Sequence, residues 1–90
     1  MVSKVIQDCE EIMRQLVKSG FTNQVSKGSL EDTIRVIRGG DPRTLQNWTR
    51  NLIRLEYVKQ INPSVFQMNL TKVNGLVEMV VRERGQRKLL

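Results

Sequence analysis

The stretch at residues 42–55 carries most of the side chains that could do chemistry in this chain. It is predicted to be a helix, and a rotation of about 100° per residue separates its polar residues from its apolar ones. Arginine and amide side chains share one arc of about 100°, and these residues are Arg43, Gln46, Asn47, Arg50 and Arg54. Such side chains suit the base edges and phosphates of nucleic acids, and Thr44 suits a phosphate or a thymine methyl group. An exposed helix face is polar in any case, but no Asp or Glu occurs from Pro42 to Leu55, which favours the nucleic-acid interpretation.

The opposite side of the same helix is predicted to be buried. Its members are Leu45, Trp48, Leu52 and Leu55, with Ile53 at one edge. An indole that stacked on bases would have to be exposed. Because Trp48 falls among leucines, we expect it to belong to the core.

The start of this helix is marked by a run of four residues. Gly39 and Gly40 can end a preceding helix, since glycine adopts left-handed conformations without a Cβ clash. Asp41 is a suitable N-cap, and Pro42 suits the first helical position, where no amide hydrogen is needed. A helix before the glycine pair therefore turns directly into the helix at residues 42–55.

The remaining pattern predicts an α+β chain, mainly α, that forms a single domain over residues 1–90. The expected elements are a helix at 3–18, a short strand within 21–27, a helix at 29–38, a β-hairpin at 57–70 and a C-terminal helix at 71–84. Ser29 and Asp32 have capping-box spacing for the second helix, and Thr71 is expected to cap the last one.

Composition excludes several classes of site. The chain has one cysteine and no histidine, so it lacks the residues for an internal disulfide, a common zinc cluster or a Ser-His-Asp triad. Cys9 falls in an apolar helical stripe and is expected to be an inert buried thiol. Asp8, Glu10 and Glu11 are explained as a solvated helix face. We therefore expect no enzyme activity, no metal and no cofactor, and we infer no small-molecule effector.

The positive charge is concentrated in the second half of the chain. The net charge is +6, made of 15 Lys and Arg against nine Asp and Glu. Residues 1–40 hold six basic and five acidic residues, whereas residues 41–90 hold nine and four. A basic domain can simply be more soluble, but it also indicates an anionic partner, for which nucleic acid is the usual candidate. With no apolar run of the length that a membrane span needs, we expect a cytoplasmic, nucleoid-associated protein.

The order helix, short strand, helix, helix, hairpin resembles a winged helix-turn-helix domain. In particular, the stretch GGDPRTLQNWTRNLIRLEYVKQI is similar to the turn, recognition helix and first wing strand of small transcription regulators from archaea, their viruses and plasmids. The resemblance covers residues 3–70. It implies that the helix at 42–55 enters the major groove of double-stranded DNA, with Arg43, Thr44, Gln46, Asn47 and Arg50 at its exposed part.

The hairpin departs from the pattern of that family. Many winged helices carry Arg or Lys at the wing tip, but the tip here, residues 61–65, has no positive charge. Lys59 is the basic residue of the hairpin, and we expect it to contact the DNA backbone.

The apolar stripes of the first and last helices suggest a homodimer. Each stripe is wider than a coiled-coil seam, and the last helix, with Gly75 and several valines, is a weak helix former that needs a partner. The expected twofold interface is made of Val5, Ile12, Leu16, Val73, Leu76, Val77 and Val80. The alternative is a monomer in which the two stripes pack on each other.

Together these features predict a homodimeric transcriptional regulator that binds double-stranded DNA with sequence preference. The alternatives are a replication or architectural DNA-binding factor, and an assembly module whose Arg43–Arg54 face meets an acidic protein surface.

Overall fold

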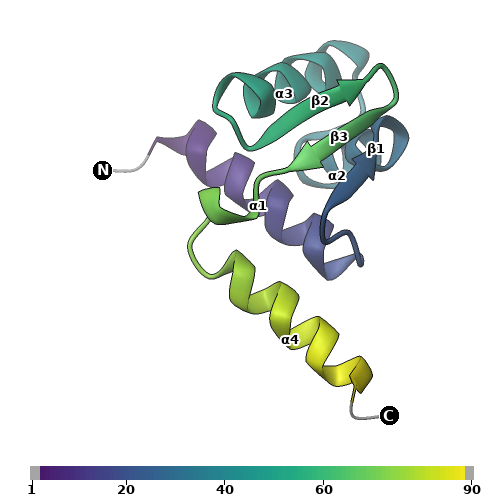
Figure 1. Cartoon of the computed structure of the whole chain (residues 1–90). Helices are drawn as coiled ribbons and strands as arrows, with labels where there is room; N and C mark the ends of the chain where they lie inside the picture. Colours follow the sequence, from purple (N-terminus) through teal and green to yellow (C-terminus); the bar gives the residue numbers. More distant parts are fainter. Residues whose placement is uncertain (1–2, 89–90) are drawn as a thin grey trace.

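A computed structural model describes residues 3–88, which form four α-helices, a short 3₁₀ helix and three strands (Figure 1). In chain order these are α1 (Lys4–Lys18), β1 (Gln24–Ser26), α2 (Lys27–Arg38), α3 (Pro42–Arg54), β2 (Val58–Asn62), β3 (Val65–Met68), η1 (Leu70–Lys72) and α4 (Leu76–Lys88). The protein is therefore α+β and mainly helical. No helix within residues 3–88 has both the length and the apolar character that a membrane span requires.

The three strands form one antiparallel sheet in the order β1-β3-β2. Val25 of β1 pairs with Phe66 of β3, and Val58 of β2 pairs with Met68. These four side chains are buried, because alternate residues of a strand point to the same face and this face lies on the helices. A bulge between Gln60 and Asn62 interrupts the pairing just before the hairpin turn.

Helix α1 supplies the largest share of the core. Ser3 caps it, since its hydroxyl accepts a hydrogen bond from the amide of Ile6 at 3.1 Å. Five residues of its apolar stripe are completely buried, namely Cys9, Ile12, Met13, Leu16 and Val17. The helix matches the prediction for residues 3–18.

Helix α2 begins two residues before the predicted start at Ser29. Its N-cap is Ser26, whose hydroxyl accepts from the amide of Ser29 at 3.2 Å. The predicted capping box at Ser29 and Asp32 is therefore wrong. The sequence signal was ambiguous, because Ser26 and Ser29 are both good caps and the chain can enter the helix at Ser26 directly from β1.

The connection between α2 and α3 consists of residues 39–41. Gly39 ends α2 with φ 112° and ψ 165°, a conformation that is essentially restricted to glycine. Gly40 has no positive φ, so only the first glycine needs its freedom. Asp41 then caps α3 by accepting from the amide of Arg43 at 2.8 Å, and Pro42 occupies the first turn.

The C-terminal helix starts later than predicted and ends later. Residues 70–72 form η1, and Gly75, with φ 82°, separates this turn from α4. Thr71 is therefore not the cap of a helix at 71–84. A left-handed glycine interrupts a continuous helix, which explains the shift to Leu76. Figure 1 shows α4 on the side of α1 away from α3.

Arg38, at the end of α2, contacts both α1 and α3. Its guanidinium lies 3.2 Å from the Asp8 carboxylate of α1. It also lies over the indole of Trp48 on α3, 5.2 Å from the ring centroid. Trp48 packs against the core, as predicted, but it is only partly buried. Its outer side is covered by Arg38 rather than by apolar residues.

Candidate nucleic-acid interface

A groove of about 470 Å³ runs beside the exposed side of α3. Helix α3, the N-terminal part of α2 and the hairpin each contribute to its lining. We call it the α3 groove, and its lining residues are Lys27, Glu31, Pro42, Leu45, Gln46, Thr49, Arg50, Ile53, Arg54, Gln60 and Phe66. The groove thus joins three segments that are far apart in the sequence.

The structure brings three of the predicted contact residues together in this groove. Gln46, Arg50 and Arg54 are exposed and line it from one side of α3. Arg43 and Asn47 are also exposed, on the part of the helix surface outside the groove. Thr44 is partly buried. The exposed polar residues of α3 therefore lie partly in the groove and partly on the helix surface beside it.

Two charged lining residues of the α3 groove were missed from the sequence as possible contacts, and both come from α2. Lys27 adds a cation at the helix start, where its backbone amide donates to the carbonyl of Ser64 at 2.8 Å and so joins α2 to the hairpin turn. Glu31 adds a carboxylate one helical turn later. The sequence pattern of α3 could not reveal either residue as part of the groove, because the packing of α2 on α3 brings them there.

The charge of the α3 groove is positive on balance. Its lining has three cations, Lys27, Arg50 and Arg54, against the single carboxylate of Glu31. Among the residues that the structure describes, none of these four takes part in an ion pair. Their charges are consequently available to a polar or anionic ligand.

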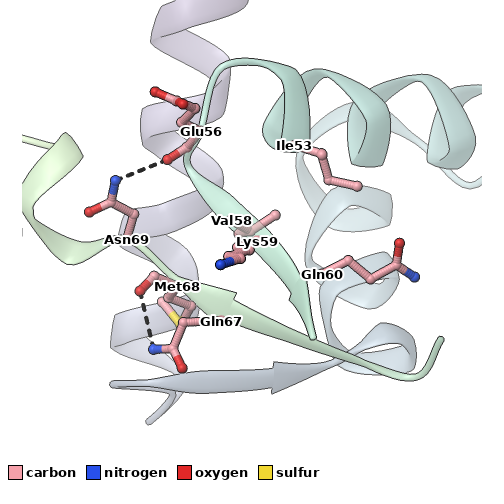
Figure 2. Close-up of a pocket in the computed structure, with 8 residues that line it drawn as sticks. All are labelled: Ile53, Glu56, Val58, Lys59, Gln60, Gln67, Met68 and Asn69. Atoms are coloured by element: carbon pink, nitrogen blue, oxygen red, sulfur yellow. Dashed lines mark hydrogen bonds between the residues drawn. The ribbon is translucent and has the colours of Figure 1, made fainter. Parts of the chain in front are cut away.

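A second hollow, of about 660 Å³, lies around β2 and the end of α3 (Figure 2). Lys59 lines this hollow and not the α3 groove. It pairs in register with Gln67, so the two side chains share the sheet face opposite to that of Gln60 and Phe66. The predicted contact residue of the hairpin thus lies outside the α3 groove that Arg50 lines.

The turn from α3 into β2 is held in a left-handed conformation at Glu56, which has φ 64°. The side-chain amide of Asn69 donates to the carbonyl of Glu56 at 3.1 Å (Figure 2). The backbone amide of Asn69 also donates to the carbonyl of Tyr57 at 2.9 Å. These bonds fix the hairpin relative to the C-terminal end of α3.

Most of the predicted dimer interface is buried inside the single chain. Ile12, Leu16, Val73, Leu76 and Val80 are at most 7% exposed, because α1 and α4 pack on each other. Among the predicted set only Val5 and Val77 are exposed, at 40% and 42%. The prediction that these residues form an exposed interface is therefore wrong for five of the seven. The apolar stripes of α1 and α4 each needed to be buried, and they bury each other within the single chain. A homodimer remains a prediction. The exposed apolar residues of α4 that could contact a second copy are Val77 and Val81.

Two ionisable groups, Cys9 and Tyr57, are buried in the core and line neither hollow. Burial, followed by the nearby carboxylates of Asp8 and Glu10, raises the pKa of the Cys9 thiol to about 11. Burial also raises the pKa of Tyr57. A neutral buried thiol is a poor nucleophile. Within the part of the chain that the structure describes, no group of acidic or cysteine side chains is arranged to hold a metal ion.

Comparisons with protein-family models, with curated proteins and with solved structures found no match to this chain.

Proposed function

We propose that this chain is a winged helix-turn-helix protein that binds double-stranded DNA through α3 and acts as a transcriptional regulator. The observation that carries the proposal is the α3 groove, in which exposed Gln46, Arg50 and Arg54 stand beside Lys27 without a competing ion pair from any described residue. Arginine and glutamine are side chains that recognise base edges in the major groove, and lysine and arginine neutralise phosphates.

The arrangement of the elements supports the winged-helix assignment. The order α1-β1-α2-α3-β2-β3 and the sheet order β1-β3-β2 are compatible with the layout of that fold. Helices α2 and α3 are joined by a short connection that contains Gly39, as in a helix-turn-helix unit. The hairpin follows α3 directly and takes the place of the wing.

The residues of α3 divide into two roles in this proposal. Arg50 donates in a fork to guanine, and Gln46 pairs with adenine, as Asn47 can on the adjoining surface. Arg43, Arg54 and Lys27 approach phosphates and set the position of the helix. An α-helix fits the major groove, which is about 12 Å wide.

A twofold dimer would place two copies of α3 on half-sites one helical turn, about 34 Å, apart. The dimer forms part of the proposal because one small module covers little DNA surface.

The test is binding to DNA duplexes from a random pool, with selection of the preferred sequence and fluorescence anisotropy at several salt concentrations. We expect log K to fall with log salt by about 0.9 for each phosphate neutralised. Arg50→Ala is expected to cost about 1–3 kcal/mol on the selected site and to relax the preference at one position. Arg54→Ala is expected to weaken all duplexes alike and to lower the salt slope by about 1.

Arg82→Ala is the matched control, because it removes the same charge from the exposed surface of α4. It is expected to leave selection and affinity nearly unchanged. A protein that shifts no duplex, or one whose binding is lost equally in the Arg50 and Arg82 variants, would contradict the proposal. Binding to an acidic protein in place of DNA would favour the assembly alternative.

A further inference from the structure

Ile53 is an apolar side chain at the edge between the apolar and the polar sides of α3. It is 37% exposed, whereas Leu45 and Leu52 of the same helix are at most 8% exposed. It lines both the α3 groove and the hollow around β2. Figure 2 shows it pointing from the last turn of α3 toward the side on which Gln60 of β2 lies. Ile53 belongs neither to the buried core nor to the partly buried apolar side chains that pack against it.

The neighbours of Ile53 are the side chains that we propose to contact base edges. Gln46, Arg50 and Ile53 follow one another at spacings of four and three residues, which places them in one row along the helix. All three line the α3 groove, together with Gln60 from the hairpin. The row thus presents an amide, a guanidinium and a branched aliphatic group in succession.

We infer that Ile53 is a specificity-determining residue that recognises the C5-methyl group of thymine in the major groove. The inference rests on the proposed DNA binding by α3. Thymine is the base that presents a methyl group in that groove, and apolar side chains make this contact. A β-branched side chain has restricted rotation about χ1, so it holds its methyl groups at a defined place and loses little entropy on contact.

The charge around Ile53 favours DNA over a second protein as the occupant of the groove. Three cations and one carboxylate line the α3 groove with it. A polyanion would satisfy this excess of cations while its base edges cover the exposed apolar surface of Ile53. The α3 groove therefore combines cations that attract phosphates with an apolar contact at Ile53.

The experiment uses the duplex selected by the wild-type protein, prepared once with thymidine and once with deoxyuridine at the positions covered by α3. Deoxyuridine lacks only the C5-methyl group. Removal of each methyl group that Ile53 touches is expected to weaken wild-type binding about fourfold, the equivalent of about 0.8 kcal/mol. Ile53→Ala is expected to bind both duplexes equally. Val36→Ala is the matched control, since Val36 is a β-branched residue of α2 that is 78% exposed and does not line the groove.

Three results would overturn the inference while DNA binding itself persists. They are a selected site without thymine under α3, equal wild-type affinity for the two duplexes, and a preference of Ile53→Ala for the thymidine duplex as large as that of the wild type. Failure of the wild-type protein to bind any duplex would instead refute the proposed function.

Discussion

Replacement of Gly39 by alanine tests how the fold directs α3. Gly39 has φ 112° and ψ 165°, and a non-glycine residue held in such a region costs about 1–3 kcal/mol. Alanine also restricts the unfolded chain, which returns about 0.4–1 kcal/mol. We therefore expect Gly39→Ala to lower the free energy of unfolding by about 1–2 kcal/mol, which corresponds to roughly 4–16 °C in Tm for a domain of this size.

The neighbouring glycine provides the control. Gly40 has no positive φ, and an added Cβ would lie 3.1 Å from side-chain atoms of Arg35. Arg35 is exposed and its ion pair with Asp32 lies at the surface, so a small shift of this side chain costs little. Gly40→Ala is therefore expected to change the free energy of unfolding by less than about 0.5 kcal/mol.

Urea unfolding followed by fluorescence measures both variants, because Trp48 is the single tryptophan and lies where α3 meets Arg38. Strain confined to the turn is expected to move the midpoint and leave the m-value unchanged. If Gly39→Ala were as stable as the wild type, or if Gly40→Ala were the more damaging change, the conformation described for this connection would be incorrect.

Three further predictions concern the rest of the molecule. Glu56→Gly removes the conformational cost of a glutamate with a left-handed backbone. It is expected to be neutral or to stabilise the fold by up to about 1 kcal/mol, since the flexibility of glycine in the unfolded chain offsets part of the gain. A destabilisation above about 1 kcal/mol in urea unfolding would contradict this prediction. The neutral Cys9 thiol has a folded pKa of about 11 against an ordinary value of 9.0, so the unfolded chain ionises first. The contribution of this thiol to stability is expected to be constant well below pH 9 and to fall as the pH rises through 9 toward 11. The thiol contribution to that fall is about 1.4 kcal/mol by pH 10, and a Cys9→Ala variant with an equally steep decline between pH 9 and 10 would refute it. If the protein is a homodimer that uses α4, Val77→Asp is expected to convert it to the 10.4 kDa monomer in sedimentation equilibrium, and a wild-type chain that already sediments at that mass would exclude the dimer.

The elements that local signals determine could be predicted from the sequence. Asp41 and Pro42 form a helix start that depends on neighbours only two residues away, and α3 begins there. The stripe of α1 required a buried face, and its central residues are buried. Where two local signals competed, prediction failed: Ser26 caps α2 instead of Ser29, and Gly75 delays α4 to Leu76.

Features that depend on tertiary packing could not be predicted in the same way. An apolar stripe shows that a helix needs a partner but does not say which one, and for this reason Leu16 and Leu76 were predicted at a dimer interface although both are buried within one chain. Likewise, the pattern of α3 contains no information about Glu31 or Lys27, because the packing of α2 brings them to the groove. Lys59 was predicted to contact the DNA backbone. It is exposed, but strand pairing places it on the sheet face opposite to that of Gln60, outside the α3 groove.

The most direct test of DNA binding by α3 is a titration of the ¹⁵N-labelled protein with a short random-sequence duplex at low salt, followed by amide chemical shifts. Non-specific binding is electrostatic and needs no knowledge of the preferred site. We predict that the largest shifts occur in α3 around Gln46 and Arg50 and at the start of α2 near Lys27, with little change in α4. Shifts concentrated in α1 and α4, or none at all at low salt, would contradict the account.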